Sequence, residues 1–409
     1  MIYSMIHIRA LREKTAWRET APSIILVLNS FVWYVLTYFV FIAIVNGLHL
    51  LEIEKLGVFT TYFVGITVSA ILGSKFFPRA RAKFLYLWLF TGAIATSLLT
   101  TISSNGMLAN ALLAFFLGAS IGVGLPSCLS YFADSTSVEN RGLVGGIIWS
   151  AVGFAVLIFA FLINMFGQWE TIVALTTWRL FGGICFLALN RKHKKRGVQK
   201  SPSYLELIRK REILLYLFPW IMFSLINFAE APILESVFGA DFAFVQLVEY
   251  AFIGIFAIVG GVIADVVGRK RVVIAGFVML GIEYAAMSVF SNSPVTLYLF
   301  LTLDGITWGL FVSVFFMAIW GDLGENREKE KYYALGGLPN LLANFVSILI
   351  SPYASDISPT AAFSFASFFL FLAVIPLMYA PETLPEKKIR ERELKGYIDK
   401  AKKVKEKYT

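Results

Sequence analysis

The chain has 409 residues, of which 58% are hydrophobic and only 15% are charged, and its formal net charge is +9. In soluble proteins about 25% of the residues are charged, and the mean hydropathy of +0.72 is correspondingly high. So few charged residues cannot form a water-facing surface, so a soluble enzyme, a disordered chain and a fibrous repeat are not expected. Cys128 and Cys185 both lie in apolar runs, so neither a disulfide framework nor a thiolate metal site is expected.

Long apolar runs recur along the chain, and most have the roughly 20 residues that cross the hydrocarbon core of a bilayer. Helices are expected, because lipid offers no partner to unpaired backbone groups and the alternating pattern of a membrane barrel is missing. We predict twelve spans, near Ser23–Val45, Gly57–Phe77, Phe84–Ile102, Met107–Phe132, Gly142–Phe166, Thr171–Leu189, Ile213–Leu234, Phe242–Ala264, Val272–Phe290, Val295–Trp320, Tyr333–Pro352 and Ala361–Ala380. The predicted fold class is an all-α, multi-pass membrane protein.

A polar break after the sixth span divides the chain into a first six-helix bundle (1–189), a basic linker (190–212), a second bundle (213–380) and a basic tail (381–409). With the N-terminus in the cytoplasm, 34 of the 36 lysines and arginines fall in cytoplasmic segments, as the positive-inside rule requires. Both termini are then cytoplasmic. The positive net charge is explained by this orientation, so no nucleic-acid partner is expected. The tail has the spacing of an amphipathic helix, which we expect to lie with the linker on the anionic inner leaflet of the cell membrane.

A weak internal repeat supports the division into halves. The loop after the fourth span contains Asp134 and Glu139-Asn140-Arg141, and the loop after the tenth contains Asp322 and Glu325-Asn326-Arg327. Parallel repeats of six helices place a solute path between the two halves.

The sharpest local motif joins the eighth and ninth spans and runs Gly261-Val-Ile-Ala264-Asp265-Val-Val-Gly268-Arg269-Lys270-Arg271. Its glycines permit a tight turn and a close approach of helices. We expect Asp265 to face the start of the fifth span, where the helix dipole favours an anion, or Arg141 nearby. Here the sequence resembles the major facilitator superfamily of secondary transporters, whose signature runs G-x-x-x-D-x-x-G-R-[RK]. The resemblance implies two bundles that rock about a central site, and a conformational latch formed by Gly261, Asp265, Gly268, Arg269, Lys270 and Arg141. A simple basic loop with a turn-forming glycine is the alternative.

Four acids lie inside predicted spans of the second half: Glu230, Glu249, Glu283 and Asp304. Each costs about 2.5–3.5 kcal/mol at the bilayer centre, so each should face protein or water. In the superfamily the first, fourth, seventh and tenth spans line the cavity, which favours Asp304 and Glu230 as groups that bind a proton or a cationic solute. Contacts between helices are the structural alternative, Glu249 fits either role, and Glu283 is interpreted as structural because its span is peripheral.

Further candidates for solute contact are Asn29 and Trp33 in the first span, Asn227 in the seventh and Trp308 in the tenth, because aromatic walls with a few polar groups suit an organic ligand. Arg179 lies in the middle of the sixth span. We interpret it as a paired structural residue, with binding of an anionic substrate as the alternative.

The leading hypothesis is a secondary transporter that moves a small organic solute by alternating access, coupled to protons. Metabolite or sugar symport is favoured, because the fifth span of this chain lacks the proline of the drug-antiporter signature and has only Gly145-Gly146 there. Efflux of drugs or organic cations in exchange for protons is the alternative, and a non-transporting receptor or scaffold is a different class. An enzyme is not expected, because no HExxH, GxSxG or phosphate loop is found. We expect no cofactor or metal, and a monomer.

Overall fold

The computed structural model describes residues 17–76, 81–102, 106–163, 165–189, 199–290 and 293–385, with residues 394 and 398. Within these ranges twelve helical spans are long and apolar enough to cross a membrane, as predicted from the sequence. The predicted amphipathic tail falls almost wholly outside the described residues, as does the first part of the linker, 190–198.

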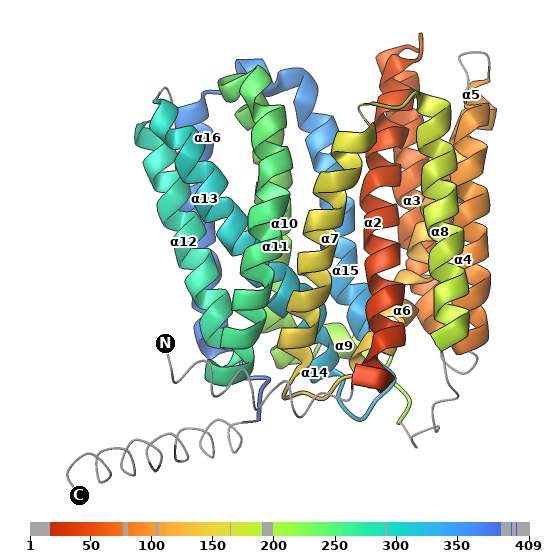
Figure 1. Cartoon of the computed structure of the whole chain (residues 1–409). Helices are drawn as coiled ribbons and strands as arrows, with labels where there is room; N and C mark the ends of the chain where they lie inside the picture. The colour runs from red at the N-terminus through yellow and green to blue at the C-terminus, as the bar shows by residue number, and fades with distance from the viewer. Residues whose placement is uncertain are drawn as a thin grey trace, which may run out of the picture.

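The spans of the first half follow one another with short connections (Figure 1). They are α2 (Trp17–Gly47), α3 (Glu52–Phe76), α4 (Arg81–Ser97) with η2 (Leu98–Thr101), α5 (Met107–Gly122) with α6 (Leu125–Asp134), α7 (Arg141–Ile163) and α8 (Gln168–Leu189). Pro126 stands in the first turn of α6, where a missing N–H costs nothing, so it divides the fourth span into α5 and α6.

The second half has the same order of spans. They are α10 (Arg211–Phe238), α11 (Ala240–Val267), α12 (Arg269–Val289), α13 (Pro294–Phe311) with η3 (Val312–Ile319) and α14 (Trp320–Leu323), α15 (Glu330–Ile350) with η4 (Ser351–Asp356), and α16 (Pro359–Tyr379). The η3 segment is a π-helix in which every residue is buried. In the linker, the short helix α9 (Tyr204–Ile208) begins at a capping box formed by Ser203 and Glu206.

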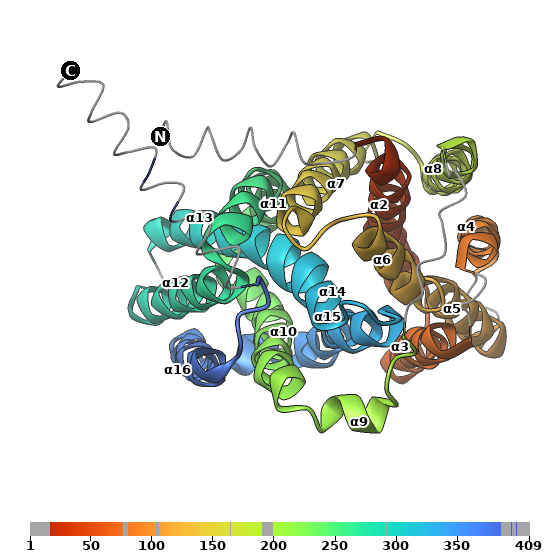
Figure 2. The same cartoon turned by 90° about the horizontal axis from the view of Figure 1, so that it is seen from below.

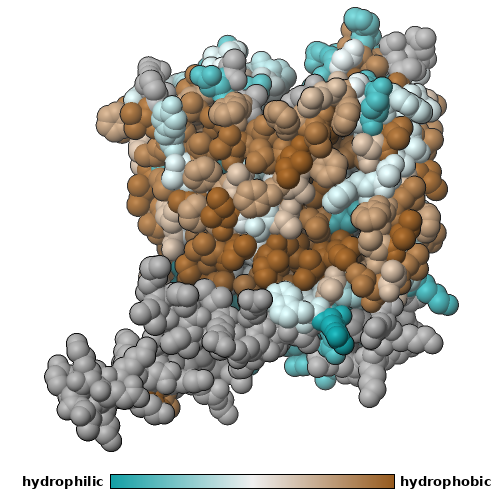
Figure 3. All heavy atoms as spheres, in the orientation of Figure 1, coloured by the Kyte–Doolittle hydropathy of each residue, from teal (hydrophilic) through white to brown (hydrophobic). Residues whose placement is uncertain are grey.

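The helices begin earlier than the apolar runs predict. The first span starts at Trp17 rather than Ser23, and the eleventh at Glu330 rather than Tyr333. Helical hydrogen bonding continues beyond the apolar segment, so polar residues at the membrane surface extend each helix. Hydrophobic residues dominate the middle of the molecule and hydrophilic ones the top of the view (Figure 3), the pattern of a multi-pass integral membrane protein.

The spans of the first half lie mainly on one side of the molecule and those of the second half on the other (Figure 2). Between them α7 packs closely along α11. A Cβ atom on Gly142 would lie 2.6 Å from the carbonyl oxygen of Gly261, and one on Gly146 would collide with the carbonyl oxygen of Ala257. The absence of side chains at these glycines is what allows the two helices to touch.

Candidate functional site

A cavity of about 1060 Å³ lies between the two halves. It is lined from α2, α3 and α7 of the first half and from α10, α11, α12, α13 with η3, and α15 with η4 of the second. Its lining includes Ile53 and Tyr353, both of which are well exposed at the end of the molecule where α3 begins and α15 ends. We call this the far end, and the cavity opens there.

Two carboxyl groups meet on one wall of the cavity. Glu249 of α11 and Asp304 of α13 both line it, and their carboxyl groups are close enough to interact electrostatically. Asp304 is 2% exposed, and its Oδ1 has no partner among the described residues. Two neighbouring carboxylates repel one another, and a proton on either of them removes that repulsion. The pair is therefore suited to binding a proton.

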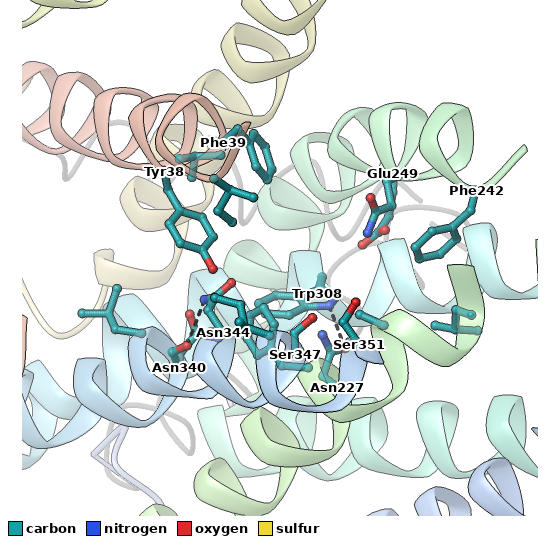
Figure 4. Close-up of a pocket in the computed structure, with 18 of the residues that line it drawn as sticks. Tyr38, Phe39, Asn227, Phe242, Glu249, Trp308, Asn340, Asn344, Ser347 and Ser351 are labelled. Atoms are coloured by element: carbon teal, nitrogen blue, oxygen red, sulfur yellow. Dashed lines mark hydrogen bonds between the residues drawn. The ribbon is translucent and has the colours of Figure 1, made fainter. Parts of the chain in front are cut away.

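Amides and hydroxyls form a second wall (Figure 4). Trp308 donates from Nε1 to Oδ1 of Asn227 at 3.2 Å. On α15, Asn344 donates from Nδ2 to the carbonyl oxygen of Asn340 at 3.3 Å. Ser347 of α15 and Ser351, the first residue of η4, also line the cavity. The Nδ2 of Asn340 is a buried donor without a partner in the described part of the chain, so it is available to an acceptor on a solute.

Aromatic rings form the remaining walls. On α2, Tyr34 and Tyr38 stack with ring centroids 6.3 Å apart, and Phe31 packs against Trp149 of α7 at 4.9 Å. The indole Nε1 of Trp149 is buried without a partner in the described ranges. The sequence contains 38 Phe and 17 Tyr, so composition and spacing do not single out the few that line the cavity.

Of the predicted solute-contacting residues, the structure brings four to the cavity: Asp304, Glu249, Asn227 and Trp308. Glu230 does not line it. Glu230 is 6% exposed on α10, and its Oε2 has no partner among the described residues.

Asn29 and Trp33 also lie away from the cavity, toward α4 and α8. Asn29 donates from Nδ2 to the carbonyl oxygen of Trp178 at 2.6 Å, and Trp33 donates from Nε1 to Oγ1 of Thr96 at 2.7 Å. The cavity side of α2 is the opposite, aromatic face that carries Tyr34 and Tyr38. The hydrogen bonds of Asn29 and Trp33 instead join helices within the first half.

Arg179 is fully buried in α8 and does not reach the cavity. Its guanidinium lies between two indoles, 4.0 Å from the ring centroid of Trp33 and 4.3 Å from that of Trp88. Nη1 donates to Oδ1 of Asn29 at 3.1 Å and to Oγ of Ser30 at 2.8 Å. Cation–π contacts and neutral acceptors thus replace the acid that a buried arginine usually requires.

The opposite end of the molecule, which we call the basic end, joins the two halves through charged side chains. Asp265 of α11 accepts hydrogen bonds from the first N–H groups of α7, at Gly142 (3.0 Å) and Leu143 (2.6 Å). Arg269 also pairs with Asp265, at 2.5 Å. As predicted, the acid faces the start of the fifth span, where the unpaired N–H groups of a helix attract an anion.

Asp322 at the end of the tenth span completes this cluster. It forms an ion pair with Arg141 of α7 and accepts a hydrogen bond from Nε of Arg269 at 3.2 Å. The side chains of all three residues are fully buried. Gly268 has φ +109°, where a side chain would be strained and would also collide with Glu382.

Glu382 fixes the start of α12 beside that glycine. Its carboxylate accepts from the backbone N–H of Arg269 at 2.8 Å and of Lys270 at 3.1 Å. The ammonium of Lys270 turns back to the carbonyl oxygen of Met378 at 2.7 Å. Lys270 therefore binds the end of α16 and not the partner half.

A second cluster at the basic end repeats the first. Arg81 donates from Nε to Oε1 of Glu330 at 2.7 Å and from Nη1 to Oδ2 of Asp134 at 2.5 Å. Lys329 donates to Oδ1 of the same aspartate at 2.7 Å. Arg81, Asp134 and Arg141 stand 188 residues before Arg269, Asp322 and Lys329. Both clusters tie the first half to the second, so the basic end is closed while the far end is open.

Comparison with known proteins identifies this architecture. A sequence profile described as Major Facilitator Superfamily matches residues 213–406. The match covers the second bundle and most of the tail. A search of curated protein sequences gives no match.

Solved structures share the superfamily fold at low sequence identity. The human organic anion transporter MFSD10 (TETRAN) is 15% identical, with TM-score 0.64 over 88% of this chain and 99% of that one. The proton:xylose symporter XylE is 14% identical, with TM-score 0.65 over 90% and 96%. The fucose:proton symporter FucP of E. coli is 10% identical, with TM-score 0.68 over 88% and 98%. At such identities the likeness establishes the fold and not the substrate.

Proposed function

We propose that this chain is a member of the major facilitator superfamily, moves a small organic solute across the cell membrane by alternating access and couples that movement to protons. The observation that carries the proposal is that two carboxyl groups, Glu249 and Asp304, lie in the same cavity wall, with Oδ1 of Asp304 buried and without a partner among the described residues. A pair that holds one proton can lose it when a solute or a conformational change alters its surroundings, because the second carboxyl is immediately able to share the charge.

The two rocking units are residues 1–189 and 213–380, and the basic end faces the cytoplasm. The cytoplasmic assignment rests on the positive-inside distribution of lysine and arginine. In this orientation the cavity is open to the outside, and the charged clusters that involve Asp265, Asp322 and Glu330 form the closed cytoplasmic gate. Opening requires those contacts to break while α2, α3 and α15 approach one another at the far end. We expect the transporter to work as a monomer, with the basic linker and tail on the inner leaflet.

Metabolite or sugar symport is the favoured mode. The amide and hydroxyl wall of Asn227, Asn340 and Asn344 offers donors and acceptors to a solute with several hydroxyl groups, and the aromatic walls suit its less polar faces. Two of the superfamily structures that share this fold are titled as proton symporters of sugars.

Export of organic cations in exchange for protons is the second candidate, and one observation favours it. Among the described residues that line the cavity, the only cationic side chain is Lys55, which lies in the first turn of α3 at the mouth. A positively charged solute would therefore meet carboxyl groups without competition from a fixed cation.

The experiment that tests the proposal uses purified protein in liposomes that contain a pH-sensitive dye. A panel of sugars, carboxylic metabolites and organic cations is added outside, and the internal pH is followed. Symport predicts acidification with a transported solute, and antiport predicts the opposite sign. Asp304→Asn should abolish the pH change, and Glu170→Gln, an exposed acid at the start of α8, should not. Solute movement without any pH change would exclude proton coupling, and no movement of any solute would favour a scaffold.

A further inference from the structure

The described part of the linker is bound to the second half through its main chain. We call residues 199–204 the strap. The N–H of Gln199 donates to the carbonyl oxygen of Asn326 at 3.2 Å, and the carbonyl oxygen of Gln199 accepts from the N–H of Glu328 at 2.9 Å. These two bonds pair the strap with the loop after the tenth span in a parallel bridge. Because both bonds are made by the main chain, they do not depend on the side chain of Gln199.

The loop that is paired with the strap also carries part of the basic-end contacts. Lys329 and Glu330 form ion pairs with the first half in the second cluster. The strap is bound on both sides of these two residues, to Glu328 through the bridge and to Lys331, whose ammonium donates to the carbonyl oxygen of Pro202 at 2.8 Å. The strap therefore holds the stretch of chain from which the second cluster reaches the first half.

The strap itself also contacts the first half. The hydroxyl of Tyr204 is hydrogen-bonded to Oγ of Ser74, which lies near the end of α3. Ser74 gives its own proton to the carbonyl oxygen of Ile71 at 2.8 Å, so the tyrosine is the donor in this bond. Ser74 is 1% exposed, which shields the bond from water. In the view along the helices, α9 lies at the rim of the molecule, between the ends of α3 and α10 (Figure 2).

The second half fixes the direction of the Tyr204 side chain. The capping box of Ser203 and Glu206 starts α9 at this tyrosine, and Leu207 in the same helix is fully buried. The ammonium of Lys331 lies 5.9 Å from the centroid of the Tyr204 ring. The tyrosine is thus positioned by residues of the linker and of α15, and its hydroxyl reaches across to α3.

We propose that the strap is a third closing contact of the basic end, in which Tyr204 is the positioning residue. Its bond to Ser74 forms when the basic end is closed and breaks when the basic end opens. This role rests on the alternating access proposed above, in which α3 moves away from the second half at that end. The strap moves with the second half, because Asn326 and Glu328 belong to it. The linker then does more than tether the two bundles, since it adds to the stability of the closed state.

Hydrogen exchange of the protein in lipid nanodiscs, read by mass spectrometry, tests this role and needs no solute. The amides of Gly142 and Leu143 donate to Asp265 across the interface, so we call them the gate amides. They exchange when the basic end opens, at a rate proportional to the open population. The amides of Gln199 and Glu328, the strap amides, report whether the strap leaves the second half.

Tyr204→Phe keeps the ring and removes the hydroxyl. The gate amides should exchange about fivefold faster in this variant, because the closed state loses one neutral hydrogen bond, while the strap amides keep the wild-type rate. Ser74→Ala removes the other partner and should give the same factor. The double variant should be no faster than either single variant, because the two residues act through one bond.

Tyr216→Phe is the matched control. Tyr216 of α10 donates from its hydroxyl to the carbonyl oxygen of Pro381 at 2.6 Å. The variant loses the same kind of bond at the same end of the molecule, but both partners follow the linker in the chain and lie on the side of the second half. Its gate amides should therefore exchange at the wild-type rate.

Three results overturn the role of the strap. The first is a wild-type rate at the gate amides in Tyr204→Phe, or an equal acceleration in Tyr216→Phe. The second is a double variant whose effect is the product of the two single effects, because the two hydroxyls would then act separately. The third is faster exchange at the strap amides in Tyr204→Phe, because the hydroxyl would then hold the strap to its own half. Faster gate amides together with a failed solute panel would refute transport and leave the strap in place.

Discussion

Removing the carboxylate of Asp265 should open the basic end. In the wild-type protein the Asp265 carboxylate accepts from the N–H groups of Gly142 and Leu143 at 3.0 and 2.6 Å. In Asp265→Ala both N–H groups lose this acceptor, and Arg269 loses one of its two acidic partners. A hydrogen bond to a charged group contributes about 1.5–3 kcal/mol. The lower value for two bonds gives about 3 kcal/mol, and about 1.4 kcal/mol corresponds to a factor of ten in an equilibrium constant. The ratio of closed to open basic end should therefore fall roughly 100-fold.

Distances between spin labels measure this ratio directly. Cysteines introduced at the exposed positions Ser137 and Arg271 place one label on each half at the basic end, after Cys128 and Cys185 have been replaced. Wild-type protein in lipid nanodiscs should give mainly the short distance of the closed end, and Asp265→Ala should give a dominant longer distance.

Asp134→Ala provides the matched control. Asp134 also bridges the halves, through Arg81 and Lys329, but its side chain is 35% exposed. Exposed ion pairs contribute about 0–1 kcal/mol because water screens them, so the shift in this variant should be less than about fivefold. An unchanged distance distribution in Asp265→Ala, or an equal shift in both variants, would refute the assignment of closure to the buried carboxylate.

Four other variants test three separate parts of the structure. Asp304→Asn and Glu249→Gln should each reduce solute-linked proton movement in liposomes at least about tenfold while solute exchange across the membrane continues, and loss of both activities would contradict a role confined to protons. Gly146→Ala places a methyl group against the carbonyl oxygen of Ala257 and should destabilise the protein by about 1–3 kcal/mol, seen as a lower melting temperature in detergent; an unchanged temperature would mean that the helices separate at no cost. Arg179→Lys keeps the charge but loses the planar stack between two indoles and should cost about 1–2 kcal/mol in the same assay; wild-type stability would show that the stack contributes nothing.

The twelve spans could be predicted because the length of an apolar run is fixed by the bilayer. The position of Asp265 opposite the fifth span could be predicted too, because a helix start needs acceptors wherever it is buried. The face of α2 that lines the cavity could not, since that helix is buried among protein on several sides and carries polar groups on the side away from the cavity. Asn29 and Trp33 are spaced like ligand-binding residues, yet their partners are Trp178 and Thr96 of other helices.

The role of an embedded acid depends on its direction around the helix, which the sequence of one span does not reveal. Glu230 belongs to a span that lines the cavity but does not line it itself, and Glu283 belongs to a span expected to be peripheral but is fully buried. Tertiary packing decides both cases. The energetic cost of placing an acid in the membrane requires only that the residue face protein or water. It does not specify which protein groups the residue contacts.

Both clusters at the basic end place a carboxylate at the start of a helix, but the helix that carries the carboxylate differs between them. In the second half Asp265 ends one helix and binds the start of another, α7. The equivalent acid is missing from the first half, where residue 77 is Phe. There the fully buried Glu330 stands in the first turn of α15 and pairs with Arg81 across the interface. A carboxylate is favourable at a helix start whichever helix carries it. The lack of an acid at residue 77 therefore does not imply a weaker gate, because Glu330 supplies a carboxylate from the other side of the contact.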